Sequence, residues 1–120
     1  KGDRGGGVTT LSSRNDRLLA MASRKTIAVI ESLVEPDQVL PGPHEVYIAP
    51  VHIDAVVLAP GGEHPTGCAG LYDIDVNHMA AYVTAAKDKS SFQQYLETYI
   101  LNPKDHKEYL AKVGFTVDGK

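Results

Sequence analysis

The sequence from Ala59 to Asp75 reads Ala-Pro-Gly-Gly-Glu-His-Pro-Thr-Gly-Cys-Ala-Gly-Leu-Tyr-Asp-Ile-Asp, and it holds four of the eleven glycines. It lies between an apolar run and a segment of helical periodicity. Its prolines stiffen the loop, and its glycines permit positive φ angles and close approach of a ligand to the backbone. Polar side chains gathered in such a loop indicate a functional site, and a tight strand-to-helix connection with ordinary turn chemistry is the alternative.

Two apolar runs before the loop predict parallel β-strands. Residues 26–30 and 53–59 are rich in β-branched side chains, as in strands buried on both faces. A helix predicted over residues 16–24 precedes the first run, and a helix followed at once by a strand is typical of a parallel α/β unit. Shorter strands are predicted at residues 8–11 and 46–48.

After the loop the apolar periodicity becomes helical and stays so to the end of the chain. Asp75 is the predicted N-cap of a first helix, and Ser90 or Ser91 that of a second. Asn102-Pro103 ends the second helix and starts a third, which Gly114 closes. The aromatic residues on these helices indicate core packing rather than a cofactor site.

These elements predict an α/β fold with an open, mostly parallel sheet and a helical C-terminal tail. We assign residues 8–60 to the strands and first helix, 60–75 to the site loop and 76–114 to the tail, within a single segment 1–120. Three or four short strands form a thin sheet for a free-standing domain. We therefore expect more chain, or a partner, to complete the domain, and the start at Lys1 also indicates a fragment or a processed chain.

Composition excludes several classes of partner. The net charge of −3 and the pI near 5.9 argue against nucleic acid, because binding to a phosphate backbone needs a basic face. No apolar run is long enough to cross a bilayer and no signal-peptide pattern opens the chain, so we expect a cytoplasmic protein without a membrane partner. The single cysteine excludes an internal disulfide and a cysteine-rich zinc site.

Three kinds of chemistry can use the residues of the loop. The first is a metal site, but no His-x-His or His-Glu-x-x-His spacing is present, and we predict no metal. Its candidate ligands are Glu63, His64, Asp73 and Asp75, together with His52 or His78.

The second kind is a nucleophile pair of Cys68 and His64, for which no third, orienting group can be identified. The third is a loop that positions an anionic substrate through the backbone amides of Gly61 and Gly62, the Thr66 hydroxyl and the His64 imidazole. The third interpretation asks least of the sequence.

The order Ala-Pro-Gly-Gly-x-His-Pro-Thr-x-Cys-x-Gly-x-Tyr-x-x-Asp, after Ile-Asp-Ala-Val-Val, resembles the C-terminal part of the alpha (A) subunit of glutaconate CoA-transferase-type (family I) enzymes. The resemblance covers nearly the whole chain. Asp3-Arg4 before the glycines and Glu31 after the first apolar run fit the same register. One departure is Gly6-Gly7, where the family leads us to expect Gly-Asn.

The resemblance implies the NagB/RpiA/CoA-transferase fold, with an active site between the alpha subunit's loop and a beta (B) subunit in a hetero-oligomer. It implies transfer of CoA from an acyl-CoA thioester to a carboxylic acid through a glutamyl-CoA intermediate, with no bound cofactor. The nucleophilic glutamate is expected on the beta subunit, so no residue of this chain is assigned as catalytic, and the chain alone is expected to be inactive. The residues expected to bind substrate are Gly61, Gly62, His64, Thr66 and Tyr72.

Two alternatives stay open. A hydrolytic branch of the same family opens carbon rings of steroid-derived CoA thioesters, and this segment does not distinguish the two reactions. The segment could also be a non-catalytic assembly module whose loop packs against a partner subunit. The family register places the missing part on the N-terminal side, whereas the acyl group, the acceptor acid and the stoichiometry are left undetermined.

Overall fold

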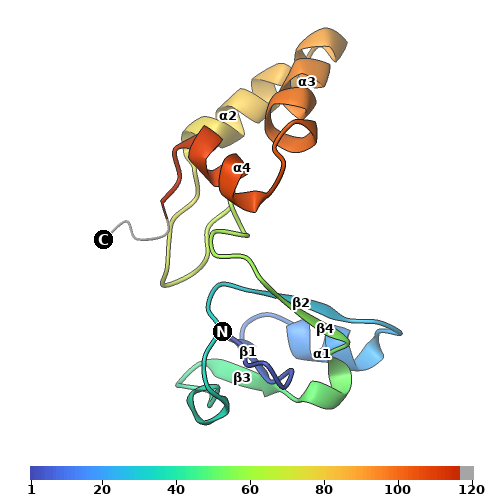
Figure 1. Cartoon of the computed structure of the whole chain (residues 1–120), viewed down its shortest axis with the longest axis vertical. Coiled ribbons are helices and arrows are strands. Elements are labelled where there is room, and N and C mark those ends of the chain that lie inside the picture. Colours follow the sequence, from blue (N-terminus) through green and yellow to red (C-terminus); the bar gives the residue numbers. More distant parts are fainter. Residues whose placement is uncertain (117–120) are drawn as a thin grey trace. The chain divides into compact units, whose positions relative to one another are not determined.

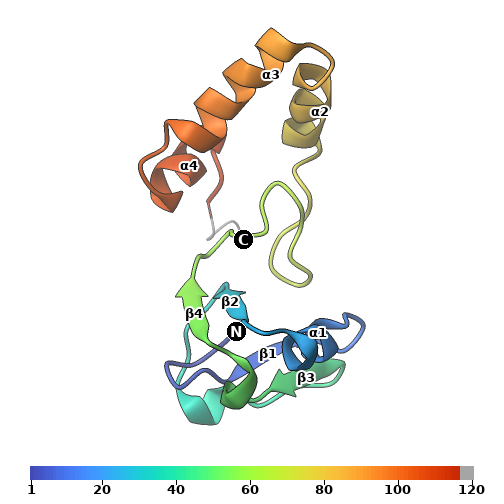
Figure 2. The same cartoon turned by 90° about the vertical axis from the view of Figure 1, so that its right-hand side faces the viewer.

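A computed structural model describes residues 1–116 of the 120-residue chain. These residues form two compact units that meet in the sequence between Gly62 and Glu63. Figures 1 and 2 show the strands of the first unit and the helices of the second from two directions. Each unit is described by itself.

The first unit contains the strands. Its elements are β1 (Val8–Leu11), α1 (Asp16–Ala22), β2 (Ile27–Ile30), β3 (Glu45–Ile48) and β4 (Ala55–Leu58), with short 3-10 turns at Pro36–Gln38 and Pro50–His52. The four predicted strands and the predicted helix are all present, within three residues of their expected bounds. The α/β class is therefore confirmed.

The strands pair as two separate two-stranded sheets. The pair β2 and β4 is parallel, as predicted, with Ile27 opposite Ala55 and Ile30 opposite Leu58. The pair β1 and β3 is antiparallel, with Val8 opposite Ile48, whereas the prediction had one mostly parallel sheet. Strand direction carries no signature in runs of four residues, and here the reversal ends in a turn where His44 has a φ of 65°.

The core of the first unit lies between the two sheets and α1. Its buried members come from β1, α1, β2 and β3, and half-buried apolar residues pack against them. The buried members are Val8, Ala20, Ile30 and Ile48, and the half-buried ones are Ala28, Leu33, Ile53 and Val56. A second anchor is Asp3, a buried carboxylate that accepts hydrogen bonds from Gly5 N at 2.6 Å and Gly7 N at 3.1 Å.

The second unit is helical after its loop. Its helices are α2 (Val76–Ala85), α3 (Lys89–Leu96), a π-helical extension at Glu97–Leu101 and α4 (His106–Val113). Asp75 caps α2 by accepting a hydrogen bond from His78 N, as predicted. Gly114 closes α4 with a φ of 69°, also as predicted.

The predictions for the other two N-caps were wrong. Asp88, not Ser90 or Ser91, caps α3, because its carboxylate accepts from Ser91 N and from both serine hydroxyls. The hydroxyl bonds, first that of Ser90, lower the pKa of Asp88 to about 2. Asp105 rather than Asn102 caps α4, because the π-helical turn carries the preceding helix through to Leu101. Between residues 1 and 116, no helix combines the length and apolarity that a membrane span requires.

Candidate functional site

The end of β4 leads into a turn that depends on its two glycines. Gly61 has a φ of 75°, and its N–H donates to Glu31 Oε2 at 2.6 Å. A Cβ on Gly62 would lie 2.7 Å from Ala59 O, closer than real Cβ atoms come. Glu31 follows β2 directly, so its carboxylate joins the carboxyl ends of both parallel strands, the edge where open α/β sheets place ligands.

The loop of the second unit is folded onto itself by hydrogen bonds at Glu63. Glu63 N donates to the Tyr72 hydroxyl at 3.0 Å, and Thr66 Oγ1 donates to Glu63 O. Cys68 and Tyr72 exchange two backbone hydrogen bonds, of 2.9 and 3.0 Å, which close the loop at its far end. A Cβ on Gly67 would lie 2.9 Å from Ile74 N, so the two halves of the loop approach closely.

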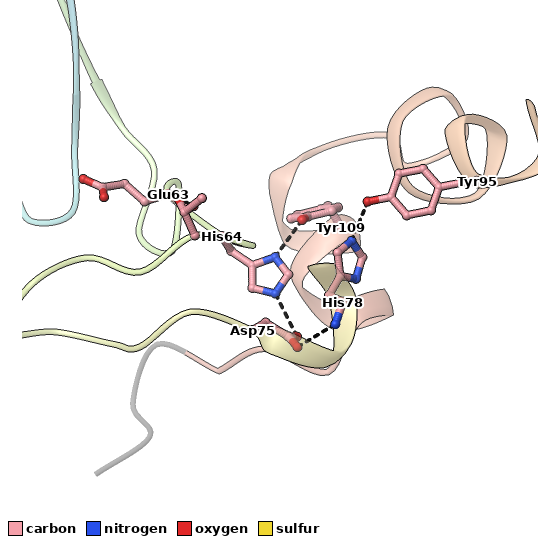
Figure 3. A network of polar contacts seen from close by, with 7 residues as sticks. Glu63, His64, Asp75, His78, Tyr95 and Tyr109 are labelled. Carbon is pink, nitrogen blue, oxygen red and sulfur yellow. Dashed lines mark hydrogen bonds and ion pairs between the residues drawn. The ribbon is translucent and has the colours of Figure 1, made fainter. Parts of the chain in front are cut away.

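His64 is held at both ring nitrogens, as Figure 3 shows. Its Nε2 lies 3.2 Å from Asp75 Oδ2, and its Nδ1 lies 2.7 Å from the Tyr109 hydroxyl. Because a carboxylate can only accept, Nε2 carries a proton, and in the neutral ring the Tyr109 O–H then donates to Nδ1. The side chain of His64 is 1% exposed, and we call this arrangement the Asp75–His64–Tyr109 network.

A second histidine packs against this network. The rings of His64 and His78 are 5.2 Å apart between centroids, edge to face. His78 Nε2 lies 2.7 Å from the Tyr95 hydroxyl on α3. Further ring contacts come from Phe115 against His64 and from Tyr99 against His78. The loop is thereby attached to α2, α3 and α4 of the same unit.

The electrostatics of the cluster favour one arrangement of protons. Hydrogen bonds from His78 N and then from His64 lower the pKa of Asp75, so it is ionised. Burial, followed by the neighbouring His64, lowers the pKa of His78. Burial also raises the pKa of Tyr95 and of Tyr109, so both hydroxyls keep their protons. At neutral pH, Tyr95 therefore donates to a neutral His78.

The residues predicted to bind substrate differ in their exposure. Gly61 and His64 are buried, Tyr72 is half-buried, and Gly62 and Thr66 are exposed. In the second unit, His64, Thr66 and Tyr72 belong to one hydrogen-bonded loop. The part played by all five residues in substrate binding stays a prediction.

The other two interpretations of the loop find little support in the geometry. Among residues 1–116, no three His, Cys, Asp or Glu side chains gather closely enough to hold a metal ion. Both ring nitrogens of His64 are engaged by Asp75 and Tyr109, so activation of Cys68 by this imidazole would require one of those bonds to break.

Sequence reasoning missed Tyr109 as a partner of His64. It placed Tyr109 on the apolar face of its helix and assigned the face to core packing. A tyrosine on a packed face needs a partner for its hydroxyl, and that requirement was the available signal. The partner itself lies 45 residues away in the sequence.

The chain was compared with protein families, curated proteins and solved structures. No protein-family model matches it. It is 36% identical over 98 residues to the alpha subunit of glutaconate CoA-transferase from Acidaminococcus fermentans, which covers 82% of this chain and 31% of that protein. The crystal structure of glutaconate coenzyme A-transferase from the same organism matches with a TM-score of 0.86 and 32% identity, over 97% of this chain and 37% of that one. The chain belongs to the family of glutaconate CoA-transferase alpha subunits.

Other relatives in this alpha-subunit family carry related names. The alpha subunit of 3-oxoadipate CoA-transferase from Pseudomonas knackmussii is 30% identical over 95 residues, which is 78% of this chain and 33% of that protein. The cholesterol ring-cleaving hydrolase IpdA subunit of Mycobacterium tuberculosis is 30% identical over 87 residues, or 71% of this chain and 30% of that protein. The chain thus spans about a third of the length of these curated relatives.

Proposed function

We propose that this chain is part of the alpha subunit of a CoA-transferase, which moves CoA from an acyl-CoA thioester to a carboxylic acid. The observation that carries the proposal is the homology, 36% identity over 82% of the chain together with a TM-score of 0.86. The partner is a beta subunit, which the naming of the relatives by subunit supports. The chain by itself is expected to be inactive.

The nucleophile in this chemistry is a glutamate of the beta subunit. Its carboxylate attacks the thioester carbonyl and CoA leaves as the thiolate, which gives an acyl-glutamyl anhydride. The thiolate then attacks the glutamyl carbonyl and releases the first carboxylic acid as its carboxylate. The acceptor carboxylate repeats these two steps in reverse, so one difficult acyl transfer is divided into easier covalent steps.

The part of this chain is to position the substrate with its loop. Thr66 is the exposed polar side chain of the hydrogen-bonded segment from Glu63 to Thr66. Its hydroxyl proton points to Glu63 O, so its free lone pairs can accept a hydrogen bond from an amide N–H of the acyl-CoA. To donate to a carboxylate oxygen, the hydroxyl must rotate away from Glu63 O. Buried His64 then supports the loop from behind.

Replacing Thr66 with valine tests this part. We expect KM for the acyl-CoA to rise by about five- to tenfold with little change in kcat, because one neutral hydrogen bond contributes roughly 1 kcal/mol. Steady-state kinetics of the assembled enzyme measure it. Thr66→Ser keeps the hydroxyl and should retain most of the affinity, and Thr84→Val, at an exposed threonine on α2, is the matched control. Equal kinetics for Thr66→Val and Thr84→Val would remove Thr66 from the substrate site.

The reaction itself is tested with acyl-CoA donors and carboxylate acceptors. After incubation with acyl-CoA and removal of free substrate, the beta subunit should carry one CoA by intact mass. Borohydride should reduce that thioester and abolish activity, whereas borohydride without acyl-CoA should have no effect. Turnover of a panel of acyl-CoA thioesters without any covalent adduct would contradict the proposed intermediate.

The second candidate is a hydrolase that opens a ring in a CoA thioester, which the 30% identity to the cholesterol ring-cleaving hydrolase subunit supports. The two candidates differ in their need for an acceptor. A transferase turns over only when a carboxylic acid is supplied, whereas a ring-opening hydrolase consumes water and leaves the thioester intact. Mass analysis of the CoA products with and without acceptor separates them: exchanged acyl groups indicate transfer, and a gain of one water on the same thioester indicates hydrolysis.

A further inference from the structure

One face of the parallel pair β2 and β4 is apolar and open. Ile27 and Val29 of β2 are 67% and 60% exposed, and Val57 of β4 is 45% exposed. The register places Ile27 beside Ala55 and Val29 beside Val57, so these four side chains lie on the same face. None of the four is polar. Figure 2 shows the two strands side by side.

The opposite face of the same pair is covered. Ile30 is 3% exposed and belongs to the core of the first unit, and Ala28 and Val56 pack against that core. In a sheet with one face in water, polar residues alternate with apolar ones, whereas parallel sheets are buried on both faces and read as continuous apolar runs. The sequence of β2 and β4 is of the second kind, so its open face requires a cover.

We propose that this face is covered by an apolar helix from the same subunit, contributed by residues outside this 120-residue chain. The matched relatives are about three times as long, so such residues exist in proteins of this kind. Crossover helices are what cover the faces of parallel sheets. Four side chains fit one helix, whereas a stable interface between subunits takes roughly 20 to 30 residues from each side.

The cover lies against the start of the site loop. A Cβ on Gly62 would come within 3.4 Å of Val29 Cγ1, so the open face reaches Gly62. The covering helix is therefore positioned to fix the turn at Pro60–Gly62 from the side that Glu31 does not contact. The inference depends on the homology and not on the proposed reaction.

Cysteine labelling of the natural, full-length subunit tests the proposal. Val29→Cys removes little volume and introduces a thiol on the open face. Val51→Cys is the matched control, because Val51 is 84% exposed and lies outside the sheets. Each variant is treated with a small maleimide, first in isolation and then in complex with the beta subunit. The labelled peptides are separated from that of Cys68 by mass spectrometry, and labelling after denaturation shows that both thiols react.

In isolation we expect Val29→Cys to react at least 100-fold more slowly than Val51→Cys. Equal rates in isolation, followed by protection when the beta subunit is added, would overturn the proposal in favour of a cover from the partner. Protection that appears only as the protein concentration rises would overturn it in favour of a second copy. Equal rates under all conditions would show that nothing covers the face.

Discussion

Replacing His64 with alanine is expected to lower the free energy of unfolding of the helical unit by about 3 kcal/mol, because a buried ring is lost from a packed site. The side chain is 1% exposed, and its ring contacts His78, Tyr109 and Phe115. The substitution also leaves the Tyr109 hydroxyl without its acceptor, and an unsatisfied buried polar group costs roughly 1 to 3 kcal/mol. The effect should lie in the second unit, because Asp75, Tyr109 and the contacting rings all belong to it.

Tyrosine circular dichroism near 280 nm measures this unfolding selectively. Five of the six tyrosines lie in residues 63–116, and the chain has no tryptophan. His44→Asn is the matched control: His44 is exposed, and asparagine tolerates its positive φ. His64→Gln should recover part of the loss, since its amide can bond with Asp75 or Tyr109. If His64→Ala unfolds at the same denaturant concentration as His44→Asn, the network does not stabilise the unit.

A loss of activity in the same variant would need this comparison before it could be assigned to substrate binding. Buried His64 and exposed Thr66 occupy one loop, and only the second can meet a ligand without rearrangement. We therefore expect His64→Ala to lower kcat through the amount of folded protein, whereas Thr66→Val should act on KM. This difference separates a residue that positions the loop from one that contacts substrate.

Local patterns predicted the elements well, and failed where the structure depends on distant partners. The strand at residues 55–58 and the cap at Asp75 follow from β-branched residues and from a carboxylate before an apolar stripe. The choice of Asp88 over Ser90 as a cap was also available locally, because an aspartate at that place can bind the free N–H groups. By contrast, nothing in residues 8–11 indicates that β1 pairs antiparallel with β3.

The loop was found from its residue types, but its internal contacts were not. Glycines, prolines and a histidine in one short segment mark a shaped loop, and the structure confirms that Gly61 adopts a positive φ. His64 was interpreted as a ligand group because an imidazole in a loop has both functions available. Its burial depends on Tyr109, and the pairing of a loop with a helix 45 residues later has no local signature.

The stability of the helical unit is expected to fall as the pH is lowered from about 6.5. His78 has a pKa below 6.5 in the folded state, through burial and the neighbouring His64. The unfolded chain therefore binds more protons than the folded one below pH 6.5, so stability is complete above that value and is lost as the pH falls toward the folded pKa. Each unit by which the pKa is lowered corresponds to a tenfold change in the folding equilibrium.

The groups that face His78 explain why its charged form is disfavoured. The Tyr95 hydroxyl donates to Nε2 of the neutral ring, and His64 and Tyr99 lie against its faces and edges. Asp75 is the nearby anion, but its carboxylate already serves His78 N and His64 Nε2. The pKa of Asp75 is itself lowered from 3.8, so its contribution is also lost toward acid pH, in a lower range.

Urea unfolding followed by tyrosine circular dichroism at about pH 7.5, 6.0 and 5.0, on either side of the ordinary histidine pKa, measures this dependence. His78→Gln removes the titrating group and keeps an amide oxygen near Tyr95, so the variant should lose less stability than the parent across this range. His44→Asn, which removes an exposed histidine, should keep the parent slope. Proton NMR of the imidazole gives the folded pKa directly, and a value at or above 6.5 for His78 would contradict the prediction. Such a value would also mean that Tyr95 does not donate to His78 at neutral pH, and that a charged imidazole is instead held between two rings and the Asp75 carboxylate.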